Sequence, residues 1–421
     1  MSGSKTFSIA EMKDISALIT QAKKGVLRAQ LTLANLYESD KAGFFDIGLA
    51  ALWYLEAAQQ GSAVAQVRIG ELYLDGLGIG KSQKEAINWF RKAATQNNAD
   101  ALSNLAWCYQ KGLGLKQNNK RSFSLYHKAA KLGHAGARYN LGYMYANGLG
   151  VSQSIRKALK WYGQAAKMRN VKAQLAMGLL YERGVGVDKS AIEAVEWYRK
   201  AAEQGYAKAQ YNLAGMYAGG HGVPQDDYQA VNWQQLAARQ GYSRAQYNLG
   251  LCHLYGRGIV QDNAEAIEWL LKSAAKGYRK AQYRLGKIYA EGRGVPADAV
   301  AAARWFRLAA RQGYAKAQYH LARQFSEGLG VGQDDAIAHN WYVKAAKAGY
   351  LPAQYGLGLI YAGGRGVQQD YVKAYSWLFV AAASNEPNAL RSLKAVKKKL
   401  EQEQLVEAAQ AGERLSLKYG L

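Results

Sequence analysis

Small and apolar residues follow helical spacing in pairs of short stretches along the chain. Within residues 241–276, the first stretch carries them at Ala245, Leu249, Gly250 and Cys252. A Gly-Arg-Gly segment interrupts the pattern, and a second stretch resumes it at Ala266, Trp269 and Ala274. This spacing predicts a helix, a tight turn and a second helix.

The same unit returns at a fixed period. Successive tryptophans of one series lie 36 residues or twice 36 apart, at Trp53, Trp89, Trp161, Trp197, Trp233, Trp269, Trp305, Trp341 and Trp377. A glycine series from Gly25 to Gly349 keeps the same step, with Asn97 and Arg169 in its gaps. The period predicts a tandem array, because no single helix pair can bury its own apolar face.

The period also sets the expected boundaries. We expect a capping helix in residues 1–24 and a helical cap in residues 385–421. Between them we expect ten repeats, at residues 25–60, 61–96, 97–132, 133–168, 169–204, 205–240, 241–276, 277–312, 313–348 and 349–384.

Residues around each turn indicate how the helices begin and end. Paired glycines such as Gly220 and Gly222 suit a helix end, because glycine takes positive φ without a Cβ clash. Acidic or amide residues such as Asp226 then open the second helix as N-caps. Tryptophan four residues before an Ala-Ala pair predicts a bulky side chain beside a small surface, where a neighbouring helix can approach.

The motif A-Q-Y-N-L-G-x-x-Y-x-x-G-x-G-V, followed by W-Y-x-x-A-A-x-x-G, resembles the Sel1-like repeat family, a relative of the tetratricopeptide repeat. The resemblance implies an all-α fold, a right-handed α-solenoid of helix-turn-helix repeats. It also implies a non-enzymatic scaffold or adaptor, since members of the family include bacterial proteins of signalling, envelope and secretion systems. Cys108 and Cys252 are the only cysteines, so the chain departs from the cysteine-rich members.

Charge and hydropathy narrow the class of partner. The formal net charge is +24, and windows 97–132, 133–168 and 277–312 contribute +5, +5 and +6. A chain this basic attracts acidic partners, although charge also serves solubility alone. No apolar run is long enough for a membrane helix, and no export signal is visible in the first 25 residues, so we expect a cytoplasmic protein.

No arrangement of residues indicates catalysis, a metal site or a cofactor. The histidines stand singly, without the spacing of metal ligands, at His127, His134, His221, His253, His320 and His339. Glycine strings such as Gly76-Leu77-Gly78 imitate a phosphate loop, but they recur as turns without a preceding strand. We therefore predict no enzyme and no bound cofactor.

The candidate partner-binding residues form three columns on the first helices, which line the concave groove in the related tetratricopeptide arrays. They are cations at Lys208, Arg244, Lys280 and Lys316, tyrosines at Tyr211, Tyr247, Tyr283 and Tyr319, and Asn212, Asn248, Arg284 and His320. Cations, flat aromatics and amides suit an extended acidic segment of a partner protein. Alternatively, the tyrosines pack against neighbouring helices.

Three further interpretations remain open. Asn248, Lys280 and Arg284 resemble part of the carboxylate clamp of tetratricopeptide domains, although Tyr211 and Gly215 occupy its other positions. An immunity or inhibitor protein would neutralise a folded toxin or effector. A nucleic-acid or anionic-membrane binder would use basic outer stripes, at Arg304, Arg307, Arg311, Lys160 and Lys167.

Overall fold

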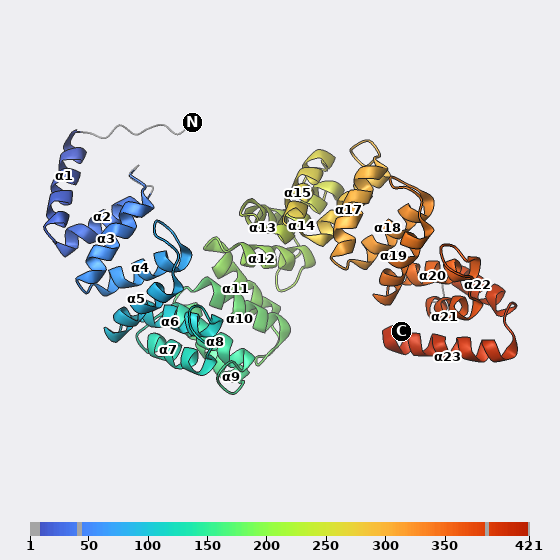
Figure 1. Cartoon of the computed structure of the whole chain (residues 1–421), viewed down its shortest axis with the longest axis horizontal. Coiled ribbons are helices and arrows are strands. Elements are labelled where there is room, and N and C mark those ends of the chain that lie inside the picture. Colours follow the sequence, from blue (N-terminus) through green and yellow to red (C-terminus); the bar gives the residue numbers. More distant parts are fainter. Residues whose placement is uncertain (1–8, 40–43, 384–386, 420–421) are drawn as a thin grey trace. The chain divides into compact units, whose positions relative to one another are not determined.

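The computed structural model describes residues 9–39, 44–383 and 387–419, and every regular element within them is a helix (Figure 1). The chain divides into two compact units, Met1–Gln204 and Gly205–Leu421. The helices of the first unit are α1 (Ile9–Lys23), α2 (Leu27–Glu38), α3 (Ile47–Gln59), α4 (Ala63–Asp75), α5 (Gln83–Thr95), α6 (Ala99–Lys111), α7 (Asn119–Lys131), α8 (Ala135–Asn147), α9 (Ile155–Lys167), α10 (Val171–Arg183) and α11 (Ala191–Glu203). Those of the second unit are α12 (Ala207–Gly219), α13 (Asp227–Arg239), α14 (Ser243–Tyr255), α15 (Asn263–Ala275), α16 (Arg279–Glu291), α17 (Ala299–Arg311), α18 (Ala315–Glu327), α19 (Asp335–Lys347), α20 (Leu351–Gly363), α21 (Tyr371–Ala382), α22 (Pro387–Lys397) and α23 (Gln402–Tyr419).

Helix pairs stack side by side within each unit. The even-numbered helices from α2 to α20 are the first helices of the repeats, and the odd-numbered helix that follows each is its second helix. Within a unit, a second helix packs on its own first helix and on the first helix of the next repeat. This arrangement confirms the predicted all-α solenoid of helix-turn-helix repeats.

Glycine and polar caps bound the helices as the sequence predicts. α12 ends at Gly220, whose φ of 63° is left-handed. α13 begins after Asp226, whose carboxylate accepts a hydrogen bond from the backbone N–H of Gln229 at 2.9 Å. Asn97 and Arg169 also have positive φ, of 58° and 62°, so they take over the conformation of the glycines that they replace.

In six repeats a deeply buried aromatic side chain follows the tryptophan, at Tyr54, Phe90, Tyr162, Tyr198, Phe306 and Tyr342. Trp305 is half-buried, whereas Phe306 is only 2% exposed. A Cβ on Gly286 would lie 2.6 Å from the Phe306 ring, so this glycine lets the ring enter between α16 and α17. We predicted that tryptophan alone supplies the bulky side chain of the helix. Two adjacent aromatic residues supply it instead, and the second of them fills the centre of the repeat.

A column of buried glutamines joins successive helices, and the sequence pattern alone did not single it out. Gln282 of α16 donates from Nε2 to the carbonyl of Ala274 at 3.2 Å. Its Oε1 accepts a hydrogen bond from Gln312 at 2.8 Å. These contacts tie α15, α16 and α17 together while satisfying a buried amide.

Additional helices pack at both ends. Ala22 of α1 joins Ala29 and Leu33 of α2 in one apolar cluster. At the other end α23 packs on α21, where the Ser376 hydroxyl donates to the carbonyl of Ala408 at 3.0 Å. Residues 1–8, 385–386 and 420–421 of the predicted caps lie outside the described residues, as do residues 40–43 and 384 of the predicted first and tenth repeats. None of the described helices has the length and apolar character needed to cross a membrane.

Candidate partner-binding surface

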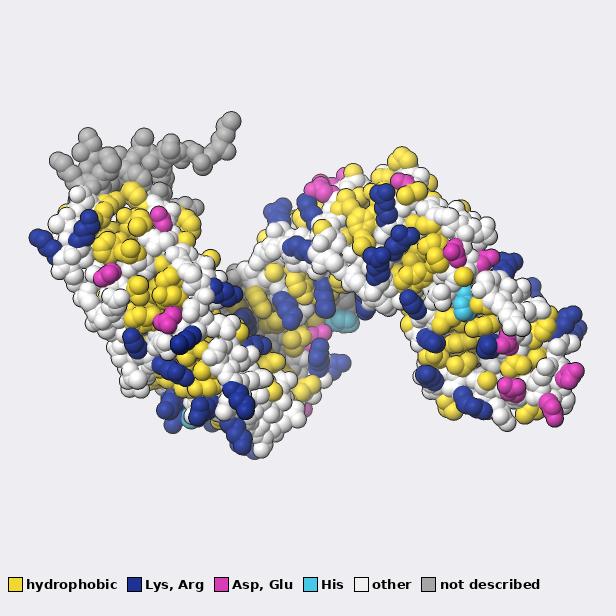
Figure 2. All heavy atoms as spheres, viewed as in Figure 1, with side chains coloured by type: hydrophobic (Ala, Val, Ile, Leu, Met, Phe, Trp, Pro, Cys, Tyr) yellow, Lys and Arg dark blue, Asp and Glu magenta, His cyan; other side chains and the backbone are white. Residues whose placement is uncertain are grey.

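The predicted cation column is exposed. Each of its four members is the second residue of a first helix, on α12, α14, α16 and α18, at Lys208, Arg244, Lys280 and Lys316. None forms an ion pair within the described residues. On the face shown in Figure 2, Lys and Arg side chains lie beside hydrophobic ones over much of the chain, and Asp and Glu are sparser. The four cationic side chains of the column are therefore open to solvent.

The tyrosine column is half-buried and holds neighbouring repeats together. Each ring meets, edge to face, the tyrosine that precedes the next first helix, and the ring centroids are 5.2–5.4 Å apart. The pairs are Tyr211 with Tyr242, Tyr247 with Tyr278, Tyr283 with Tyr314, and Tyr319 with Tyr350. This geometry suits aromatic packing. The tyrosines thus form part of the repeat interface, and only part of each ring remains exposed.

The third column contains two kinds of side chain, asparagine amides without a hydrogen bond within the described residues and side chains that contact other residues of the chain. Asn212 and Asn248 are half-buried, and their side chains make no hydrogen bond within the described part of the chain. His320, in contrast, stacks on Phe306 with the ring centroids 5.0 Å apart. Burial, followed by the charges of Lys287 and Arg323, lowers the pKa of His320 to about 4, so the imidazole is neutral near pH 7.

Arg284 lies against a tyrosine that the sequence pattern did not mark. Its guanidinium donates to the Tyr255 hydroxyl at 3.0 Å, and its buried Nε has no hydrogen-bond partner among the residues that the structure describes. Arg293 lies over the same ring, with its guanidinium carbon 4.9 Å from the centroid. No carboxylate pairs with Arg284 within the described residues, so two guanidinium groups share one tyrosine side chain.

The family model of the Sel1 repeat matches the chain ten times, over residues 28–62, 63–98, 99–134, 135–170, 171–206, 207–242, 243–278, 279–314, 315–350 and 351–386. The chain belongs to the Sel1 repeat family.

Solved structures of Sel1 repeat proteins agree with this assignment. A protective antigen of uropathogenic Escherichia coli strains, described as displaying an SLR fold, is 31% identical, with 96% of this chain and 95% of that chain covered and a TM-score of 0.55. A Sel1 repeat protein from Oxalobacter formigenes is 34% identical, with 73% of this chain and 89% of that chain covered and a TM-score of 0.56. A comparison with curated proteins gave no significant match.

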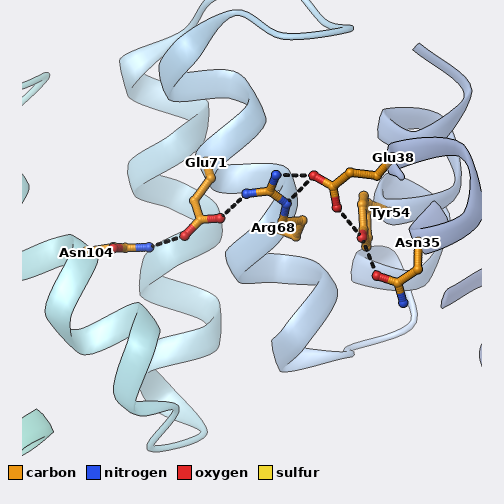
Figure 3. A network of polar contacts seen from close by, with 6 residues as sticks. All are labelled: Asn35, Glu38, Tyr54, Arg68, Glu71 and Asn104. Atoms are coloured by element: carbon orange, nitrogen blue, oxygen red, sulfur yellow. Dashed lines mark hydrogen bonds and ion pairs between the residues drawn. The ribbon is translucent and has the colours of Figure 1, made fainter. Parts of the chain in front are cut away.

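A Sel1 array allows the same position to be compared between repeats, and Arg68 is the counterpart of Arg284, six repeats earlier. Arg68 forms ion pairs with Glu38 and Glu71 (Figure 3). The Tyr54 hydroxyl lies 2.7 Å from Glu38 Oε2. Although burial acts to raise it, hydrogen bonds from Arg68 and Tyr54 hold the pKa of Glu38 below its usual value. The first Sel1 repeats therefore neutralise this arginine internally, whereas α16 does not.

The basic outer stripe lies on the second helices. Arg304 and Arg311 of α17 are exposed and have no ion-pair partner within the described residues. Arg307 is half-buried, with its guanidinium carbon 5.9 Å from the Phe325 centroid. This stripe carries charge on α17 but adds little aromatic surface to it.

Metal binding depends on how the histidine, cysteine and acidic side chains are placed. Within the described residues no three His, Cys, Asp or Glu side chains are placed to hold a metal ion. Cys108 and Cys252 are free thiols, and burial raises the pKa of each to about 11. Thiols with raised pKa are poor nucleophiles near pH 7.

Proposed function

We propose that the protein is a non-enzymatic scaffold that captures an acidic, extended segment of a partner protein on the first helices α12, α14, α16 and α18. The observation that carries this proposal is the contrast between Arg68 and Arg284. Two carboxylates of the chain itself pair with Arg68, whereas Arg284 has no ion-pair partner within the described residues and donates to the Tyr255 hydroxyl. A partner carboxylate would supply the charge that this surface lacks.

The residues around Arg284 include other positively charged side chains. Lys280 is one helical turn before it on α16 and is exposed, and Arg293 shares Tyr255 with it. A hydrogen bond to a charged group contributes about 1.5–3 kcal/mol when it is formed in a protein. Several carboxylates spaced along one segment would therefore bind this surface together, where a single carboxylate would bind weakly.

Asparagine and tyrosine side chains suit the remaining parts of an extended segment. The free amides of Asn212 and Asn248 offer both a donor and an acceptor to peptide groups. The exposed edges of Tyr211 and Tyr247 offer flat contact, and their packing on the next repeat already fixes them. A surface ordered in advance loses less conformational entropy on binding.

Two matched charge reversals test the proposal. The double variant Lys280→Glu, Arg284→Glu changes the candidate surface on α16. The double variant Arg304→Glu, Arg311→Glu changes the outer stripe on α17, the second helix of the same repeat, by the same net charge. The probe is a fluorescein-labelled decapeptide of Asp and Glu, and its control carries Asn and Gln instead. Anisotropy gives the affinity at two salt concentrations, and far-UV circular dichroism checks the fold.

We expect the first pair of substitutions to weaken binding of the acidic peptide at least about tenfold. The second pair should weaken it only slightly, because charges outside the binding surface act mainly over long range. Equal losses for both pairs would contradict a localised site. Loss only for the outer-stripe pair would favour a nucleic-acid or membrane-surface binder.

A further inference from the structure

A pocket of the second unit lies among α12, α13 and α14 and has a volume of about 610 Å³. Gly215 and Ala218 of α12 form one wall, Gln234 of α13 forms another, and Asn248 and Leu251 of α14 face them. This volume lies in the range of ordinary ligand pockets, about 300–1,000 Å³. The pocket includes Asn248 of the candidate surface, so it opens where the proposed partner segment would lie.

The corresponding place in the first repeats holds the network in Figure 3, and its side chains line a smaller pocket of about 360 Å³. Asn35, Glu38, Tyr54 and Arg68 occupy the four positions that are Gly215, Ala218, Gln234 and Asn248 five repeats later. Every one of these four side chains is larger in the early repeats. The pocket beside Phe306, two repeats after Gln234, is also smaller, at about 250 Å³. Of these four residues, only Gly215 and Gln234 are unique to their repeat, because alanine and asparagine recur at the counterparts of Ala218 and Asn248.

Gln234 replaces a ring that most repeats supply themselves. At the other nine counterparts the side chains are 0–8% exposed, and seven are aromatic, at Tyr54, Phe90, Tyr126, Tyr162, Tyr198, Phe306 and Tyr342. Gln234 is 4% exposed, and its Nε2 donates to the carbonyl of Ala245 at 3.2 Å. Its Oε1 accepts no hydrogen bond within the described residues. This oxygen is not fully buried, because the pocket leaves it accessible, and a donor group of a ligand can therefore bond to it.

We infer that this pocket receives a tyrosine side chain of the partner segment, an inference that rests on the proposed capture of an acidic protein segment. The ring takes the space of the missing aromatic, against Val231 and Leu251, and the hydroxyl donates to Gln234 Oε1. Tyr54 shows the same chemistry within the chain, because its hydroxyl lies 2.8 Å from Asn35 Oδ1.

Charges around the pocket select the occupant. Asp227 lines one side, and its charge disfavours a partner carboxylate inside the pocket. Arg257 lines another side, is exposed and forms no ion pair within the described residues. A neutral phenol therefore enters the pocket, while acidic residues before or after it in the segment meet Arg257 and the cations of α14 and α16.

Gly215 provides a variant that closes the pocket with little disturbance. A Cβ at Gly215 would meet nothing within 4 Å, and the counterparts in neighbouring repeats are Leu179 and Leu251. Gly215→Leu therefore fills the opening with a side chain that the repeat accommodates elsewhere. Gly163→Leu is the matched control, because Gly163 is also helical, equally unobstructed, and lies in the other unit.

The test is a display library of nonapeptides with a fully randomised central residue and flanks restricted to Asp, Glu, Asn and Gln, selected on the wild type and both variants. We expect tyrosine at the centre on the wild type and on Gly163→Leu, and no central preference on Gly215→Leu. Replacing the central tyrosine of a selected peptide by alanine should weaken it about 30-fold, as for a buried aromatic anchor. Replacement by phenylalanine should give a smaller loss.

The outcomes separate the two proposals. A preference for Asp and Glu in the flanks without a central tyrosine would overturn the tyrosine pocket and keep the acidic surface. A central tyrosine without acidic flanks would keep the tyrosine pocket and overturn the acidic surface. Tyrosine enrichment that persists on Gly215→Leu overturns the pocket, and no enrichment at any position overturns both.

Discussion

The imidazole of His320 lies flat on the Phe306 ring, with an interplanar angle of 13°. Its Nε2 is 3.3 Å from the Tyr283 hydroxyl, so the neutral ring forms part of the contact between the repeats that carry α16 and α18. The charged groups that act on it are Lys287, Arg323 and Glu291. A histidine in this position stabilises the fold in its neutral form.

The pH dependence of stability follows from this burial. The pKa of His320 falls from about 6.5 in the unfolded chain to about 4 in the folded protein. Between these values the unfolded state binds more protons, so the free energy of unfolding should decrease as pH falls from 6.5 to 4. His320→Asn should flatten this slope in urea titrations, whereas the exposed control His221→Asn should retain it.

The buried ring after tryptophan should matter more for stability than tryptophan itself. Phe306→Ala removes a side chain that is 2% exposed and should cost about 3–5 kcal/mol. Trp305→Ala removes a half-buried ring and should cost less. Urea denaturation compares the two variants, and a larger loss for Trp305→Ala would reverse our assignment of the core.

Two glycines of positive φ should respond differently to alanine. Gly330 and Gly349 have φ of 70° and 78°, but a Cβ at Gly330 would lie 2.1 Å from the Ala299 carbonyl oxygen, whereas one at Gly349 would meet nothing within 4 Å. Gly349→Ala should cost about 1–2 kcal/mol from backbone strain alone. Gly330→Ala should cost clearly more in the same thermal and urea measurements. Equal losses would show that the turn relaxes.

An internal carboxylate should compete with the proposed partner. Lys287 is the counterpart of Glu71, three residues after the arginine in each case. The carboxylate introduced by Lys287→Glu should therefore pair with Arg284. Binding of the acidic decapeptide should weaken several-fold, although no proposed contact is removed. Lys344→Glu on α19 makes the same change in net charge at an exposed position and should have little effect. Anisotropy titrations measure the affinity of both variants for the acidic decapeptide, and equal affinities would contradict this prediction.

The repeating pattern was enough to predict the helices, their turns and their caps, because these depend on residues that are close in sequence. Gly220 and Asp226 illustrate this, since each acts on its own helix end. The burial of Phe306 instead of Trp305 was not predictable in this way. Adjacent residues on a helix face directions only about 100° apart, so the wide apolar stripe of a buried helix includes both.

The predicted surface was harder to anticipate, because its chemistry depends on neighbouring repeats. The sequence placed Arg284 in a column of amides, but only the structure shows that Tyr255 receives it. Position 255 has Gly219 and Glu291 as its nearest counterparts, so the repeat pattern carries no signal there. The pocket beside Gln234 needs Gly215 and Ala218 from another helix, and their convergence appears only after folding.

Mapping a bound acidic peptide tests the central claim most directly. An acidic decapeptide with a photoreactive benzophenone residue, cross-linked to the full chain and located by mass spectrometry, reports which helices it contacts. The account predicts cross-links on the first helices α12, α14, α16 and α18, lost on competition with unlabelled acidic peptide and in the Lys280→Glu, Arg284→Glu variant. Competed cross-links confined to the second helices α13, α15, α17 and α19 would contradict it.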